Sequence, residues 1–257
     1  MDYTKTLVEI LKNDMMAVGF YDMVIKTPQA KVASVGQFVT ILCGSKTLRR
    51  PISICEINAE NETLRIVYQI RGEGTQWLST VKKGERIDII GPLGHGFSLK
   101  TSKNVVFVGG GIGTPPLLGA AQSCAEKADA ILGFRNTGAM ILTDDFKSAC
   151  RNVMIATDDG SYGHHGFVTD LLKKRLEDSE CDLVCACGPT PMLKAIASIA
   201  EGKGIKCQVS MEERMGCGIG ACLACVCKLK GKENEIRHAQ VCKYGPVIDS
   251  KEVIWNG

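Results

Sequence analysis

The chain has 257 residues, 45% of them hydrophobic, and a formal net charge of +3. This length is sufficient for two compact domains, and the composition predicts ordinary hydrophobic cores in a folded protein. The small, evenly mixed charge argues against nucleic acid or an anionic membrane as the main partner.

The beginning of the chain carries no recognisable export signal. Met1 to Leu11 contains two acidic residues and no apolar core of signal-peptide length. The most apolar long stretch, Val105 to Ala121, is broken by glycines and two prolines. These features predict a cytoplasmic protein.

Thirteen cysteines stand in this chain. A reducing cytosol keeps thiols free, so we expect metal ligands and small buried hydrophobes rather than a disulfide framework. The buried hydrophobes are expected among the cysteines that stand singly between apolar or helical residues. These are Cys43, Cys55, Cys124, Cys150, Cys181, Cys185 and Cys207.

Residues 1–100 show short strand-like runs separated by Gly, Asn and Lys turns, which predict a small antiparallel barrel. Apolar side chains recur at every second position from Leu64 to Ile70. One helix is expected from Thr75 to Val81, and the barrel is expected to close near Phe97. The other expected strands are Gln37 to Leu42, Pro51 to Ile57 and Gly84 to Gly91.

From Asn104 onward, continuous apolar strands alternate with helical stretches, which predicts a parallel sheet covered on both faces. The expected strands are Val105 to Val108, Ala130 to Phe134, Val153 to Ala156 and Leu183 to Cys187. The expected helices are Leu117 to Lys127, Val168 to Leu176 and Met192 to Glu201. A third, Cys-rich segment begins near Lys206. The expected domains are therefore residues 1–100, 101–205 and 206–257.

The Cys-rich segment contains an iron–sulfur spacing. Cys217, Cys222 and Cys225 follow the C-x4-C-x2-C pattern of plant-type [2Fe-2S] ferredoxins. The glycines and alanines between them allow the backbone to curl and direct amide N–H groups at an anionic cluster. One-electron transfer is the leading hypothesis.

Two cysteines compete to be the fourth ligand. Cys227 lies two residues after Cys225, whereas Cys242 lies seventeen after it. We choose Cys242, because plant-type sites take their fourth thiolate from a distant segment and a turn follows Cys242. Cys227 is then a neighbouring buried thiol.

Two glycine-containing turns indicate a nucleotide site. The strand that ends at Val108 leads into Gly109-Gly110-Gly111-Ile112-Gly113-Thr114-Pro115 at the opening of a helix, where backbone amides can approach a pyrophosphate. Proline replaces the third glycine of a Rossmann fingerprint, and Arg135-Asn136 replaces its acidic residue. Cys187-Gly188-Pro189 follows a later apolar strand.

In the barrel half, Arg50 and Ser53 offer a guanidinium and a hydroxyl that suit phosphate oxygens, and Gly74-Thr75 precedes a helix. Together with the two glycine turns and Gly91-Pro-Leu-Gly94, these motifs resemble the ferredoxin-NADP reductase superfamily over roughly residues 1–205. The resemblance implies an FAD-binding barrel and an α/β domain that brings nicotinamide to the flavin. The residues implied to contact FAD are Arg50, Pro51, Ile52, Ser53, Val67, Tyr68, Gln69, Gly74 and Thr75.

With the C-terminal cysteine motif included, the whole chain is similar to the electron-transfer subunits of type B dihydroorotate dehydrogenases. Members of that family pair with an FMN-containing catalytic subunit, as a heterotetramer of two of each chain. The resemblance implies a path from that FMN through the cluster and FAD to NAD in pyrimidine biosynthesis. It implies that this chain does not bind dihydroorotate, and no catalytic acid or base is expected here. Cys187 is implied to lie near the reacting rings.

The choice between NAD and NADP depends on Asp158 and Asp159. Both follow an apolar strand, in the region that faces the adenosine ribose in the superfamily. Carboxylates accept hydrogen bonds from a ribose 2′-hydroxyl and repel a 2′-phosphate. The alternative interpretation is that the two aspartates simply form a polar turn. We predict NAD.

Two alternatives stay open. The chain could be the reductase subunit of another redox complex, of a hydrogenase, glutamate synthase or bifurcating transhydrogenase type, because this fold serves many partners. Four cysteines would also permit a zinc-binding regulatory protein. Zinc leaves a protein colourless, whereas flavin and iron–sulfur make it brown.

Overall fold

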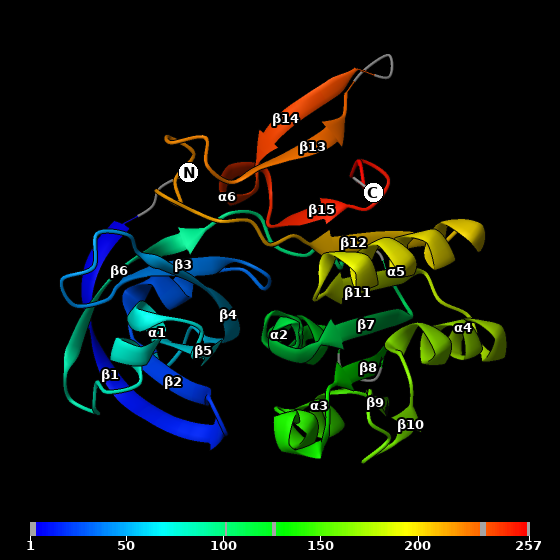
Figure 1. The fold of residues 1–257 in the computed structure, drawn as a ribbon, viewed down its shortest axis with the longest axis horizontal. Helices are drawn as coiled ribbons and strands as arrows, with labels where there is room; N and C mark the ends of the chain where they lie inside the picture. The colour runs from blue at the N-terminus through cyan, green and yellow to red at the C-terminus, as the bar shows by residue number, and fades with distance from the viewer. Residues whose placement is uncertain (1–3, 101, 125–126, 232–234, 256–257) are drawn as a thin grey trace.

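The computed structural model describes residues 4–100, 102–124, 127–231 and 235–255. Its first part is a closed six-stranded barrel in the order β1-β2-β5-β4-β3-β6, with all neighbours antiparallel (Figure 1). Alternate side chains of β5, such as Leu64 and Ile66, fill its interior. The expected antiparallel barrel is confirmed. Its elements are β1 (Thr4–Ala17), β2 (Phe20–Lys26), η1 (Pro28–Lys31), β3 (Phe38–Leu42), β4 (Arg50–Asn58), β5 (Thr63–Gln69), α1 (Glu73–Leu78) and β6 (Arg86–Leu93).

The second part is a seven-stranded sheet in the order β10-β9-β8-β7-β11-β12-β15. All neighbours are parallel except β12 and β15. Its strands are β7 (Val105–Gly110), β8 (Ala128–Phe134), β9 (Asn152–Thr157), β10 (His164–His165), β11 (Leu183–Cys187), β12 (Lys206–Ser210) and β15 (Val247–Asp249).

Helices cover both faces of this sheet, as expected for continuously apolar strands. Helices α2 (Pro115–Cys124) and α3 (Thr143–Ala149) pack with Phe107 and Leu132 on one face. Helices α4 (Val168–Asp178) and α5 (Thr190–Gly202) pack with Val106 and Val184 on the other. Two short 3-10 turns, η2 (Gly111–Gly113) and η4 (Thr137–Ala139), follow β7 and β8. Within the described part of the chain, every helix is too short or too polar to span a bilayer.

The predicted elements and the observed ones agree closely where hydrophobic periodicity is strong. β11 has the expected bounds, Leu183–Cys187, and α5 extends the expected helix by two residues at its start. α2 begins at Pro115, two residues before expectation, because proline suits the first turn of a helix. Helix α3 has no counterpart among the expectations, because its sequence, Thr-Asp-Asp-Phe-Lys-Ser-Ala, offers a single large apolar residue.

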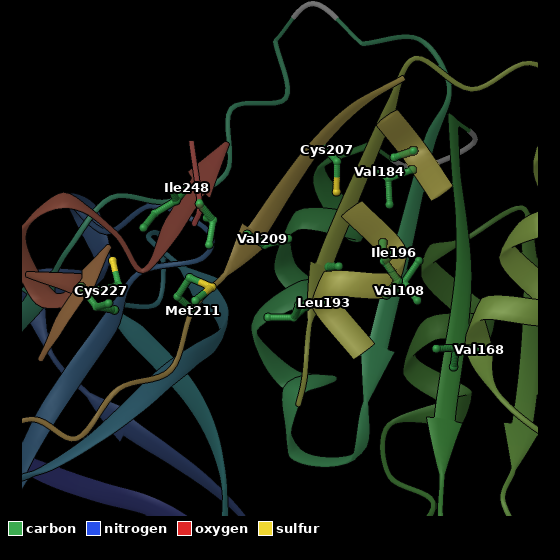
Figure 2. Packing of buried hydrophobic residues seen from close by; sticks show 14 of the residues in the cluster. Val108, Val168, Val184, Leu193, Ile196, Cys207, Val209, Met211, Cys227 and Ile248 are labelled. Atoms are coloured by element: carbon green, nitrogen blue, oxygen red, sulfur yellow. The ribbon is translucent and has the colours of Figure 1, made fainter. Parts of the chain in front are cut away.

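The Cys-rich segment departs from the sheet and returns to it. β12 pairs with β11, and β15 pairs back onto β12, with Ser210 opposite Val247. Between them lie the hairpin strands β13 (Val226–Lys230) and β14 (Ile236–Gln240), followed by α6 (Val241–Tyr244). Figure 2 shows Val209 and Met211 carrying the apolar packing of the sheet towards Cys227 of the hairpin. The domain boundary near residue 205 stays an interpretation, because residues 206–210 are a strand of the central sheet.

One arginine joins the barrel to the sheet domain. Arg65 on β5 binds Asp22 of β2 through Nε (2.8 Å to Oδ1) and also contacts Glu56 of β4. The same guanidinium reaches Asp145 of α3 through Nη1 (2.6 Å). Gln122 of α2 adds a second link, with Nε2 2.6 Å from Glu56 Oε1. The orientation of the two parts therefore depends on a shared ionic group as well as on apolar contact.

A buried carboxylate holds the start of β8. Asp129 has no exposed surface and accepts hydrogen bonds from Arg151 (2.9 and 3.0 Å), Arg175 (2.6 Å) and Asn152 (2.9 Å). Burial alone would raise the pKa of Asp129, but these donors outweigh it and lower the pKa. The ion group therefore stabilises the fold above the unfolded pKa of about 3.9, and the contribution is lost as pH falls through the lower folded pKa.

We predict that Asp129→Asn lowers the free energy of unfolding by about 3 kcal/mol, because it leaves buried Arg175 without its counter-charge. Urea titrations at neutral and acid pH measure this loss. The difference between variant and wild type should shrink on acidification. Asp178→Asn, at an exposed position of the same domain, is the control. An equal loss in both variants would contradict the role given to Asp129.

Candidate functional site

The two predicted glycine turns meet where the strand order of the sheet reverses. From β7 the chain proceeds outward to β8 and β9, whereas β11 lies on the other side of β7 and continues to β12. Cys187 pairs with Gly109 across this junction. Open parallel sheets bind ligands in the crevice at such a switch point, beyond the carboxyl ends of the strands.

The glycines of this crevice make contacts that no side chain would fit. A Cβ on Gly113 would overlap the carbonyl oxygen of Cys187 and lie 2.7 Å from the Cα of Gly188. A Cβ on Gly110 would lie 2.7 Å from Met192 Sδ and 3.1 Å from Pro189 Cδ. The two turns, more than seventy residues apart in the sequence, are thus packed directly on one another.

Two polar side chains of the crevice are Thr114, with a hydroxyl unpartnered in the described part of the chain, and Cys187, with a neutral thiol. Thr114 is fully buried beside Gly109, and its hydroxyl has no partner among the described residues. Burial raises the pKa of the Cys187 thiol to about 12, although the Ser210 hydroxyl opposes the shift. Cys187 is therefore a neutral thiol at physiological pH and is not poised as a nucleophile.

Asp158 and Asp159 lie at the carboxyl end of β9, two strands from the switch point, and both are exposed. Their amides bind the carbonyl oxygens of Phe134 (3.0 Å) and Arg135 (3.3 Å) at the end of β8. The hydroxyl and N–H of Ser161 lower the pKa of Asp159, which keeps this carboxylate ionised. The turn thus presents fixed carboxylates along the crevice edge rather than at its centre.

Arg50 of the predicted flavin motif begins β4, and its contacts differ from those of the preceding residue, Arg49. Arg49 is held by Asp88 of β6 (Nη2 to Oδ1, 2.8 Å). Arg50 makes one hydrogen bond among the described residues, from Nη1 to the Leu48 carbonyl oxygen (2.6 Å). Its guanidinium lies against Gly74, where any Cβ would overlap it. The structure therefore brings Arg50 and Gly74 together, with Arg50 retaining donors for an anion.

The neighbouring predicted residues contribute in different ways. The Thr75 hydroxyl accepts from the amides of Arg71 (2.9 Å) and Gly72 (3.3 Å), so it holds its own turn. Tyr68 points into the barrel, where its hydroxyl donates to Asn13 (2.9 Å) and its ring stacks on Tyr21. Only the peptide groups of Tyr68 are left for a ligand.

The remaining predicted residues of this region lie on the same strands. Val67 is buried in the apolar cluster that joins the barrel to the sheet domain. Gln69 is partly exposed, and its Oε1 accepts from Arg71 Nε (3.0 Å). Pro51, Ile52 and Ser53 are partly exposed on β4. Four of these residues therefore retain surface that a ligand can contact.

Four predicted cluster thiols converge as two pairs. The amides of Cys217 and Cys222 each donate to the other's sulfur (3.4 Å both), and the Cys242 amide donates to the Cys225 sulfur (3.5 Å). The Cys217 sulfur accepts from the amides of Ala221 (3.3 Å), Ile219 (3.4 Å) and Cys222 (3.4 Å). Two thiols on each of two irons is the ligand arrangement of a [2Fe-2S] cluster, so the residues fit that group.

The paired arrangement differs from a site for one ion. Among the described residues, no three His, Cys, Asp or Glu side chains are grouped closely enough to hold a single metal ion. The Cys217 charge nevertheless contributes to raising the pKa of Cys242, which places both pairs in one electrostatic site. The thiols are thus arranged around an extended group.

The thiols of Cys217 and Cys242, one from each pair, differ in acidity. Burial would raise the pKa of Cys217, but the backbone N–H groups and the Cys222 thiol lower it to about 7. Burial, the Cys225 hydrogen bond and the Cys225 charge raise the pKa of Cys242 to about 12. Metal binding requires the thiolate form, so loading this site releases the proton of Cys242.

Cys227, the competing fourth ligand, is directed elsewhere. It lies on β13 opposite Ala239, and its thiol donates to the Ala239 carbonyl oxygen (3.5 Å). Its side chain is packed in the apolar cluster of the sheet domain. The Cys242 amide, in contrast, donates to Cys225 Sγ (3.5 Å).

The cysteine loop has a buried edge and an exposed edge. A Cβ on Gly218 would lie 2.8 Å from Thr40 Cγ2 and 3.6 Å from Leu93 Cδ1, so this edge rests on the barrel. Residues 221–224 are all exposed, and Leu223 has a left-handed φ of 59°. Side chains alternate between the two faces of a strand, so the sequence of β3 could have indicated that Thr40 faces outward from the barrel. No sequence signal indicates that the cysteine loop covers it.

The comparisons with known proteins follow this geometry. Residues 212–254 match the family model described as the iron-sulfur cluster binding domain of dihydroorotate dehydrogenase B. The chain is 39% identical over 253 residues to the dihydroorotate dehydrogenase B (NAD(+)) electron transfer subunit of Caldanaerobacter subterraneus subsp. tengcongensis, covering 98% of this chain and 99% of that one.

Two solved structures are also similar. One concerns flavin-based electron bifurcation in the NADH-dependent reduced ferredoxin-NADP oxidoreductase, with a TM-score of 0.87, 32% identity, and coverage of 97% of this chain and 90% of that one. The other is a ferredoxin NADP+ reductase from Neisseria gonorrhoeae, with a TM-score of 0.62, 17% identity, and coverage of 79% and 92%. The second likeness shows the fold alone.

A barrel joined to a parallel sheet with a crevice at its switch point, followed by a four-cysteine segment, defines an iron–sulfur oxidoreductase of the ferredoxin reductase type. The chain belongs to the family of dihydroorotate dehydrogenase B (NAD(+)) electron transfer subunits. The fold and the family support the expected cofactor set of FAD, a [2Fe-2S] cluster and NAD.

We predict that Cys242→Ala abolishes iron–sulfur binding, because it removes one thiol of the buried pair, whereas Cys227→Ala retains it. Iron and acid-labile sulfide per flavin, with the visible spectrum, measure the outcome. Loss of the cluster in Cys227→Ala with retention in Cys242→Ala would show that the ligand set is wrong.

We predict that Gly113→Ala lowers kcat/KM for NADH in dye reduction roughly tenfold to a hundredfold, since the new methyl must displace the backbone at Cys187. Flavin content should not change. Gly202→Ala is the matched control, because nothing lies within 4 Å of its added Cβ. Equal kinetics for Gly113→Ala and wild type would remove the crevice from the nicotinamide site.

Proposed function

We propose that this chain passes electrons from the FMN of a dihydroorotate dehydrogenase catalytic subunit, through a [2Fe-2S] cluster and FAD, to NAD+ in pyrimidine biosynthesis. The observation that carries the proposal is that the cysteine loop rests on β3 and β6 of the barrel, and that β3 pairs with β4, which carries the predicted flavin motif. The cluster and the flavin, when bound, supply single-electron carriage and its conversion to hydride transfer.

The register of the barrel supports this path. Thr40 of β3, which touches Gly218 of the cysteine loop, pairs with Pro51 of β4, and Phe38 pairs with Ser53. Residues directly opposite each other in an antiparallel pair project from the same face. Neighbouring strands lie about 4.8 Å apart, so β3 under the cysteine loop is one strand spacing from Pro51 and Ser53 of the predicted flavin motif.

Residues of β4 and α1 would hold the flavin. Arg50 has guanidinium donors available for pyrophosphate oxygens, and the turn at Gly74 and Thr75 lies against it. Ser53 offers a partly exposed hydroxyl on the same strand. Because α2 rests on the later part of β4, with Gly119 against Cys55, the nucleotide crevice opens beside this motif.

The nucleotide crevice would bind NAD across the two glycine turns. Gly110 and Gly111 are partly exposed and could offer backbone amides to a pyrophosphate, and Cys187-Gly188-Pro189, packed on buried Gly113, forms the facing wall. Asp158 and ionised Asp159 would accept from the ribose hydroxyls and repel a 2′-phosphate. We therefore expect a much higher kcat/KM for NADH than for NADPH.

The exposed edge of the cysteine loop would face the catalytic subunit. Residues 221–224 are exposed, including Cys222 and Leu223, while the opposite edge is covered by the barrel. An electron can thus enter from a docked partner and leave towards the flavin. We propose a cytoplasmic heterotetramer of two copies of each chain.

The second candidate is the reductase subunit of a bifurcating transhydrogenase. It is favoured by the 32% identity over almost the whole chain to the oxidoreductase described above. That protein has the same fold, so the partner and its substrate have to distinguish the two candidates.

The deciding experiment isolates the complex anaerobically with its native partners and assays it for dihydroorotate-dependent reduction of NAD+. We expect activity in the complex and none in the isolated chain, which should still pass electrons from NADH to a dye. If the complex ignores dihydroorotate but couples NADH, NADPH and ferredoxin, the transhydrogenase candidate replaces the proposal. Equal use of NADPH in dye reduction would contradict the role given to the two aspartates.

A further inference from the structure

A buried hydroxyl without a partner lies under the cysteine loop. Thr40 is 2% exposed, and its Oγ1 has no hydrogen-bond partner in the part of the chain that the structure describes. Buried polar groups are nearly always paired, because an unmade hydrogen bond in an apolar environment is costly. This hydroxyl therefore points to a partner that binds the folded chain.

The strands around Thr40 offer it no acceptor. Its neighbour on β4 is Pro51 and its neighbour on β6 is Ile90, both apolar. Phe38 and Leu93, which complete the surface under the loop, belong to the same apolar cluster as Cys225 and Cys242. The Thr40 hydroxyl is thus surrounded mainly by apolar side chains.

The cysteine loop presses directly on this side chain. Gly218 has a left-handed φ of 75°, and a Cβ there would lie 2.8 Å from Thr40 Cγ2. Gly218 is adjacent to Cys217, whose sulfur accepts the amide of Ile219 on the other side (3.4 Å). The Thr40 side chain therefore lies against the loop that carries Cys217, where a bound cluster would bring sulfur atoms able to accept a hydrogen bond.

We propose that Thr40 is a positioning and tuning residue. Its hydroxyl donates a hydrogen bond to a sulfur of the bound cluster, on the side facing β4, the strand of the predicted flavin motif. This inference rests on the proposed function. Donation to a sulfur stabilises the more negative, reduced state and therefore raises the reduction potential. Thr40 favours electron arrival at the cluster and fixes the loop against β3.

The test uses the full chain, purified anaerobically with its cofactors. Thr40→Val keeps the shape and removes the hydroxyl, and Thr40→Ser keeps the hydroxyl. We expect Thr40→Val to lower the reduction potential of the cluster by up to about 59 mV, which is a tenfold change in the one-electron reduction equilibrium. The EPR g-values of the reduced cluster should also change. Thr40→Ser should restore both. The flavin potential should stay constant.

The control is Thr114→Val, which removes the other unpartnered buried hydroxyl, in the nucleotide crevice, and should leave the cluster spectrum unchanged. An unchanged cluster potential and EPR spectrum in Thr40→Val, or a shift of the flavin potential alone, would overturn the inference. Absence of a cluster from the wild-type chain would instead refute the proposed function. The two failures are therefore distinguishable.

Discussion

The ladder between β12 and β15 is the constraint on which the cysteine site depends. Ser210 lies opposite Val247, and the Met211 amide donates to the Pro246 carbonyl oxygen (2.8 Å), so residues 211–246 leave and re-enter the sheet at one point. Closing this long excursion removes much of the chain entropy that would otherwise oppose bringing Cys242 to the three earlier cysteines. The rigid sheet thereby supports a site made mainly of loop.

That support gives the site its polarity. Cys225 and Cys242 lie in an apolar core continuous with the sheet, whereas Cys217 and Cys222 lie in the loop between the barrel and the surface. Arg65 sets the remaining geometry, because it binds carboxylates from two barrel strands and from α3. The cysteine loop, β4 and the nucleotide crevice are thus held in a defined arrangement, although three separate parts of the chain supply them.

The sequence predicted the barrel, the parallel sheet and the glycine turns because each depends on local periodicity or on a residue with special backbone freedom. It did not predict that Lys206–Ser210 joins the sheet, since a short strand of mixed polarity resembles a loop beside a Cys-rich segment. The direction of individual side chains could not be predicted from the sequence either. Arg49 and Arg50 are alike in sequence, and only the position of Asp88 shows which is engaged. Likewise, Tyr68 turns inward to Asn13.

The exposed edge of the cysteine loop has a consequence for the subunit on its own. Cys222 lies at the surface, and the pKa of its neighbour Cys217 is about 7 without bound metal, so a separated chain that has lost its cluster presents thiolate sulfur beside this surface. Oxidative damage to cysteine follows exposure and thiolate character. A docked partner that covers residues 221–224 therefore acts as insulation as well as an electron source. Under the proposed docking, oxygen tolerance would be a property of the assembled complex rather than of this chain.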